Sequence, residues 1–85
     1  MSWHLKLAQR ARKALVKFPA KDRARILAAL EEMSRNPFSG DIVQLKAERA
    51  SWRRRVGNYR ILFDVYPEEF TVEVVEIVRR TSATY

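Results

Sequence analysis

The feature that most constrains the fold of this chain is a change of hydrophobic period near Ser51. Before this point, apolar residues recur every three to four positions, which is the period of an amphipathic helix. After it, apolar and polar residues alternate, as they do along a half-buried strand. A chain of 85 residues forms one domain with one modest core, so we expect the two halves to pack against each other.

Two helices are predicted in the first half. The apolar stripe of the first helix consists of Leu7, Ala11, Leu15 and Phe18. Pro19 ends it, because proline disfavours a helical conformation in the residue before it. The second helix is predicted from Ala20 to Arg35, and Asn36-Pro37 stops it. Its buried stripe consists of Ile26, Leu27, Leu30 and Met33.

Strands are predicted at the start of the chain and throughout its second half. The segments are Trp3 to Leu7, Trp52 to Val56, Tyr59 to Val65 and Phe70 to Val78. Gly57-Asn58 is a two-residue hairpin signal, and Pro67-Glu68-Glu69 makes the next turn. The order predicts a single α+β domain over residues 1–85. In it, an N-terminal strand and a three-stranded antiparallel meander form one sheet packed on a helical hairpin.

The composition restricts the functional class. Seventeen Lys and Arg residues against ten Asp and Glu give a formal net charge of +7, so we expect a polyanion or an acidic protein as partner. The chain has no cysteine, and the lone histidine, His4, is expected on the surface of the first strand, so no metal or other cofactor is predicted. No apolar run approaches the roughly 18 residues that span a bilayer, and no signal peptide is apparent. The cytoplasm is the expected compartment.

The segment from Trp52 to Arg60 carries the strongest functional signal. With Gly57-Asn58 as the turn, the residues expected opposite one another are Trp52 and Phe63, Arg53 and Leu62, Arg54 and Ile61, Arg55 and Arg60, and Val56 and Tyr59. Side chains alternate across a strand, so Arg53, Arg55 and Arg60 are expected on one face. Arg54 falls on the opposite, apolar face and is expected to extend to an edge of the sheet.

This arginine cluster suggests an anionic ligand. Two arginines directly opposite each other destabilise a sheet, since their Cβ atoms lie within about 5.5 Å and their charges repel. An arginine fork donates two parallel hydrogen bonds to phosphate, which lysine does not. The alternative is a solvated face whose charge is balanced by the acids Glu68, Glu69, Glu73 and Glu76.

Two residues near the C-terminus are further candidates. Strand alternation predicts one face made of Thr71, Glu73, Val75, Ile77 and Arg79. Arg79 then approaches Arg60 if their strands are neighbours. Tyr85 is read either as a frayed aromatic end or as a catalytic group.

The chain resembles the RelE/ParE superfamily of bacterial toxins from toxin–antitoxin operons over nearly its whole length. The most specific stretches are Trp52 to Phe63 (WRRRVGNYRILF) and Val78 to Tyr85 (VRRTSATY). The resemblance to the RelE branch implies a ribosome-dependent, metal-independent endoribonuclease. In that branch the 2′-hydroxyl of the message attacks the neighbouring phosphate and leaves a 2′,3′-cyclic phosphate.

The resemblance also implies roles for individual residues. Arg60 matches the arginine that stabilises the charged phosphorane-like state, Arg79 the arginine near the leaving oxygen, and Tyr85 the proposed general base. The remaining basic positions are expected to bind RNA, and these are Arg53, Arg54, Arg55 and Arg80. The implied partners are the message on the ribosome and a cognate antitoxin.

Two other functions are compatible with the same resemblance. A toxin of the ParE branch poisons DNA gyrase, and a non-catalytic module on this fold binds RNA without cleaving it. The terminal Tyr85 argues against the gyrase branch, which generally lacks that arrangement.

Overall fold

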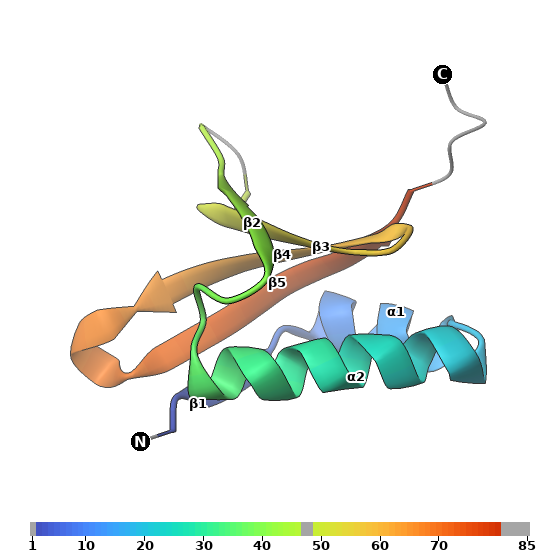
Figure 1. Cartoon of the computed structure of the whole chain (residues 1–85), viewed down its shortest axis with the longest axis horizontal. Helices are drawn as coiled ribbons and strands as arrows, with labels where there is room; N and C mark the ends of the chain where they lie inside the picture. The colour runs from blue at the N-terminus through green and yellow to red at the C-terminus, as the bar shows by residue number, and fades with distance from the viewer. Residues whose placement is uncertain (1, 47–48, 81–85) are drawn as a thin grey trace.

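The computed structural model describes residues 2–46 and 49–80, which form a five-stranded sheet with both helices on one face (Figure 1). The elements are β1 His4–Leu7, α1 Gln9–Lys17, α2 Ala20–Arg35, β2 Asp41–Gln44, β3 Trp52–Val56, β4 Tyr59–Tyr66 and β5 Thr71–Arg79. The strand order is β1-β5-β4-β3-β2, with β1 parallel to β5 and the other pairs antiparallel. None of the helices in the described ranges is long and apolar enough to span a membrane.

The predicted α+β class is confirmed, with one strand more than expected. Strand β2 pairs with β3, so the antiparallel meander has four strands instead of three. This strand was missed because it has only four residues, and its one half-buried position, Ile42, cannot produce an alternating pattern.

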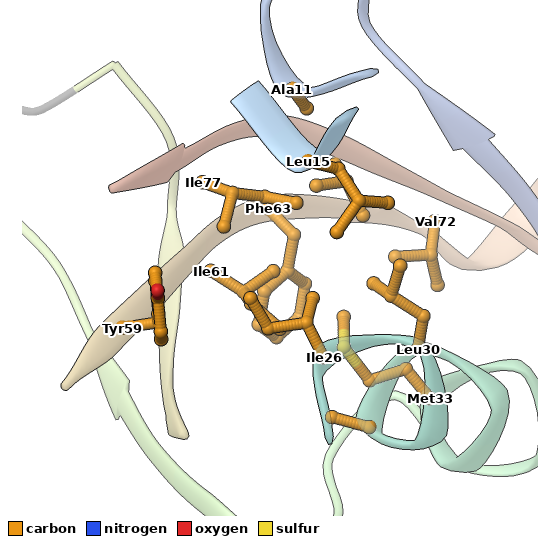
Figure 2. Close-up of a cluster of buried hydrophobic side chains, with 12 residues drawn as sticks. Ala11, Leu15, Ile26, Leu30, Met33, Tyr59, Ile61, Phe63, Val72 and Ile77 are labelled. Atoms are coloured by element: carbon orange, nitrogen blue, oxygen red, sulfur yellow. The ribbon is translucent and has the colours of Figure 1, made fainter. Parts of the chain in front are cut away.

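The core lies between the sheet and the two helices (Figure 2). Ile26 and Met33 on α2 are fully buried, as is Phe63 on β4. In Figure 2 the Phe63 ring points from the sheet toward Ile26. Trp3, Leu5 and Leu7 of the first strand region pack against this core, as their alternation predicts. The predicted stripe is wrong at Leu27, which is 49% exposed.

Strand β5 differs from its prediction at two points. It begins at Thr71 because Phe70 has a left-handed backbone (φ 48°) at the end of the preceding turn. A β-bulge then follows, since Leu62 pairs with Glu76 and Phe63 with Val74, which leaves Val75 between them. The bulge reverses the alternation. Glu73 therefore lies on the face turned away from the helices, whereas Ile77 and Arg79 lie on the helix side, and the predicted common face is wrong.

Arg54 lies between the sheet and α2 and is only 7% exposed. Its Nη2 donates to Oε1 of Glu32 at 2.5 Å, and its Nη1 donates to Oγ of Ser39 at 3.2 Å. The hydrogen bond from Arg54 and its positive charge lower the pKa of Glu32. A Cβ on Gly40, whose φ is +81°, would lie 2.7 Å from the Arg54 Cζ, so glycine leaves the room that this guanidinium occupies. The expectation that Arg54 extends to an edge of the sheet is wrong, because both of its terminal nitrogens donate inside the protein.

Candidate nucleic-acid interface

Three arginines share the face of the sheet that is turned away from the helices, here called the open face. Arg55 lies directly opposite Arg60, and Arg53 lies opposite Leu62, as predicted. Because paired residues point to the same side of a sheet, the three guanidinium groups lie together across β3 and β4. The register is fixed by the alternate residues Tyr59, Ile61 and Phe63, which are buried against the helices.

The surroundings leave arginine donors on the open face available to a ligand. Arg55 donates from Nε to Oδ2 of Asp41 at 2.9 Å. This hydrogen bond does not use the two terminal nitrogens of the guanidinium group. The Nε of Arg53 is buried, so the donors that this residue offers to a ligand are its two terminal nitrogens, which have no partner among the described residues. A bound phosphate oxygen fits such donors, because charge-assisted hydrogen bonds are the strong ones.

The four acids of the solvated-face alternative are not ion-paired with the two arginines of β3 on this face. Glu68 and Glu69 lie in the turn at the far end of β4. Glu73 and Glu76 are on the open face, but the carboxylate of Glu76 is bound by Arg49 and, at 3.7 Å, by Arg10. Within the described ranges, none of the four acids forms an ion pair with Arg53 or Arg55.

Arg79 approaches the same end of the sheet from its other side. Strand β5 is the neighbour of β4, as expected, but Arg79 lies opposite Tyr59 whereas Arg60 lies opposite Val78. Alternation therefore places Arg79 on the helix side, and the expected common face with Arg60 is wrong. The backbone N–H of Arg80 donates to the carbonyl of Asn58 at 2.6 Å and ties the end of β5 to the turn. We call this turn, Gly57-Asn58, the hairpin tip.

Tyr59 anchors the helix side of the hairpin tip. Its hydroxyl donates to Oδ2 of Asp22 at 2.7 Å, and its ring contacts Phe18 with centroids 4.6 Å apart. Burial of the hydroxyl, followed by the hydrogen bond to Asp22 and the charge of that carboxylate, raises the pKa of Tyr59, while Arg79 and Arg25 act in the opposite direction. Tyr59 is therefore a neutral structural donor.

This raised pKa predicts a loss of stability at alkaline pH. A group whose pKa is higher in the folded state contributes stability below its unfolded pKa, about 10 for tyrosine, and loses it as the pH rises through the folded value. We expect the free energy of unfolding to fall between about pH 9 and pH 11, and to fall less in Tyr59→Phe. Urea unfolding at the two pH values measures this difference. Tyr66, whose pKa is raised mainly by Asp64, contributes equally in both proteins, and identical declines would contradict the prediction.

Two of the other predicted site residues are not on the open face of the described structure, and one residue near the site was not predicted. Arg54 is buried under the sheet, and Tyr85 lies outside the described residues. Arg25 was missed, although its guanidinium lies against the hairpin tip. It lies near the N-terminal end of α2 among other basic residues, Lys21 and Arg23, so nothing in the sequence distinguishes it. Among residues 2–46 and 49–80, no group of three or more histidine, cysteine or carboxylate side chains is arranged to hold a metal ion.

Comparison with known proteins identifies a family and a fold. Residues 5–83 match the family model described as the ParE toxin of the type II toxin–antitoxin system parDE. No curated protein sequence matches the chain.

Solved toxin structures share the fold. The RelBE2 toxin–antitoxin complex of Mycobacterium tuberculosis is similar with a TM-score of 0.82 and 24% identity, over 94% of this chain and 93% of the other. The isolated RelE toxin of E. coli has a TM-score of 0.77 and 20% identity, over 93% and 85%. The RelB–RelE complex of Methanococcus jannaschii has a TM-score of 0.72 and 28% identity, over 93% and 94%. The α+β fold of this chain is thus RelE-like.

Proposed function

This chain belongs to the ParE/RelE family of toxins of type II toxin–antitoxin systems, and we propose that it is an endoribonuclease that cleaves messenger RNA on the ribosome. The observation that carries the proposal is the direct pairing of Arg55 with Arg60, beside Arg53, on the open face. Two like charges held side by side destabilise the sheet. A bound phosphate would offset this cost, because it accepts strong hydrogen bonds from both guanidinium groups.

The proposed reaction needs no metal. The 2′-hydroxyl of one nucleotide loses its proton and its oxygen attacks the adjacent phosphorus, while the bond to the 5′-oxygen breaks and that oxygen takes up a proton. The products are a 2′,3′-cyclic phosphate and a 5′-hydroxyl. Negative charge accumulates on the phosphate oxygens in the transition state, where guanidinium groups held in place provide electrostatic stabilisation.

The roles of the residues follow from this charge distribution and from the RelE resemblance. We assign Arg60 to the phosphate oxygens, Arg53 and Arg55 to the RNA backbone, and Arg79 to the leaving oxygen. Tyr85 is proposed as the general base, since a cationic neighbourhood lowers the pKa of a tyrosine toward neutrality. We leave Arg54 out, because its terminal nitrogens are bound to Glu32 and Ser39 and its Nε is buried.

A cognate antitoxin is the proposed protein partner. Several similar structures are complexes of RelE with RelB. An acidic or amphipathic segment laid over the open face would neutralise its charge and exclude RNA.

The match to the ParE family model favours a second candidate, inhibition of DNA gyrase. A gyrase poison would use the same fold and cationic surface without cutting RNA. A non-catalytic RNA-binding module would do neither, and its RNA affinity would be salt-sensitive.

Two parallel assays distinguish these functions. The wild-type protein is added to a cell-free translation extract and the message is mapped by primer extension, and it is also added to a gyrase supercoiling reaction. Cleavage within the translated message, with supercoiling unaffected, supports the endoribonuclease. Intact messages at concentrations that stop translation would contradict it, and accumulation of cleaved DNA complexes would establish the gyrase function instead.

A further inference from the structure

Ten of the twelve arginines divide into two groups by their intramolecular partners. Seven are engaged by carboxylates or carbonyl oxygens of the chain, and these are Arg10, Arg12, Arg23, Arg35, Arg49, Arg54 and Arg55. Within the described part of the chain, the guanidinium groups of Arg25, Arg53 and Arg79 form neither an ion pair nor a hydrogen bond. Arg53 belongs to the open face, whereas Arg25 and Arg79 lie on the helix side of the hairpin tip.

Arg25 reaches the hairpin tip from α2. A Cβ built on Gly57 would lie 2.8 Å from Nη2 of Arg25 and 3.3 Å from its Cζ, so the guanidinium rests directly on this glycine. The φ of +58° at Gly57 is the left-handed conformation that the turn needs, and the missing side chain also makes room for Arg25. In Figure 1 the N-terminal end of α2 lies beneath the end of the β3–β4 hairpin.

Arg25 and Arg79 act on the same neighbour. Arg79 lies directly opposite Tyr59 on the neighbouring strand, and Arg25 rests on Gly57, two residues before Tyr59. The charge of both arginines acts to lower the pKa of this tyrosine. Asp22, on the same helix as Arg25, accepts the hydrogen bond from Tyr59 through its Oδ2. Among the described residues, the helix side of the hairpin tip therefore holds two arginines without hydrogen-bond partners, beside a carboxylate that Tyr59 engages.

We propose that Arg25 binds a second phosphate, so that an RNA strand whose scissile phosphate lies at Arg60 and Arg79 continues over the hairpin tip to α2. The ligand is a backbone phosphate of single-stranded RNA beyond the scissile one. This inference rests on the proposed function for the position of the scissile phosphate at Arg60. The contact from Arg25 comes from α2, whereas the arginines of the open face come from β3 and β4.

The surroundings favour RNA over a protein segment as the occupant. Protein interfaces have an apolar centre that excludes water. Among the described residues, two large exposed apolar side chains lie near the hairpin tip, and they are on different sides of it: Val78 is on the open face opposite Arg60, and Val16 is at the end of α1. Two separate valines do not form such a centre, whereas unpaired arginines suit a phosphate backbone, which supplies charge at every nucleotide.

The test compares two non-cleavable RNAs that carry a 2′-deoxy sugar at the scissile position. One is a trinucleotide centred on that position and the other is about nine nucleotides long, within the range that a single-strand groove covers. Binding is measured by fluorescence anisotropy over a series of salt concentrations. We expect Arg25→Gln to weaken binding of the long RNA by about 5- to 10-fold and to reduce its salt slope by about 0.7, with the trinucleotide unchanged. Arg25→Lys should retain most of the affinity.

Arg35→Gln is the matched control, because it removes the same charge from the other end of the same helix. If Arg25→Gln and Arg35→Gln bind both RNAs equally well, or if Arg25→Gln weakens both RNAs to the same extent, the second site is overturned. A loss of affinity for an acidic antitoxin peptide alone would overturn it as well. Failure of the wild-type protein to cleave messages would contradict the proposed function. The binding measurements would still decide whether Arg25 contacts RNA, because they use RNA that cannot be cleaved.

Discussion

Replacing Arg60 with glutamine is expected to lower the rate of message cleavage by about 10²- to 10³-fold, the usual cost of removing one donor that stabilises transition-state charge. Arg60 lies opposite Arg55 on the open face, so its loss removes one side of the proposed phosphate site. Arg60→Lys should recover only part of the rate, because lysine keeps the charge and loses the two-pronged hydrogen bond. The rate is measured by primer extension at saturating toxin in the cell-free extract.

The same variant separates catalysis from folding. The melting temperature of Arg60→Gln is measured alongside the rate, so that a loss of cleavage in a protein still folded at the assay temperature is assigned to catalysis. Arg35→Gln removes an equal charge from an exposed helix end and should cleave at the wild-type rate. A cleavage rate for Arg60→Gln within a factor of two of this control would exclude Arg60 from the reaction.

The largest loss of stability is expected for Phe63→Ala. Phe63 is fully buried between Trp52 and Val74 on the neighbouring strands and points at α2 (Figure 2). Truncating a buried phenylalanine costs about 3 to 5 kcal/mol from lost transfer energy and the cavity that remains. That is a large part of the roughly 4 to 13 kcal/mol available to a domain of this size. Urea denaturation followed by circular dichroism measures the change.

An exposed residue of α2 serves as the control for this substitution. Leu27 is 49% exposed, so Leu27→Ala should change the free energy of unfolding by less than about 0.5 kcal/mol. Phe63→Leu should fall between the two, because leucine fills part of the space. Similar values for Phe63→Ala and Leu27→Ala would show that the core is not centred on Phe63.

The β3–β4 hairpin was predictable because two independent signals agree there. Gly57-Asn58 specifies a two-residue turn, and the alternate apolar residues specify which face is buried, so the pairing of Arg55 with Arg60 follows. The helix from Ala20 to Arg35 was equally well defined, since Pro19 and Asn36-Pro37 mark both of its ends.

The parts that could not be predicted depend on contacts between distant residues. The bulge at Val75 has no local signature, and it alone decides which face of β5 carries Glu73. Arg54 becomes buried because Glu32 and Gly40, far from it in sequence, create a site for its guanidinium. Likewise, the place of Arg25 in the candidate site depends on how α2 packs under the hairpin tip.

The chemistry at the ends of the cut message tests the central claim most directly. Messages cleaved by the wild-type protein in the translation extract are isolated, and their new 5′ ends are labelled with a polynucleotide kinase before and after phosphatase treatment. Attack by the 2′-hydroxyl predicts 5′-hydroxyl ends that are labelled without phosphatase, paired with 2′,3′-cyclic phosphates on the upstream fragments. New ends that carry a 5′-phosphate, or messages that stay intact while translation stops, would contradict the account.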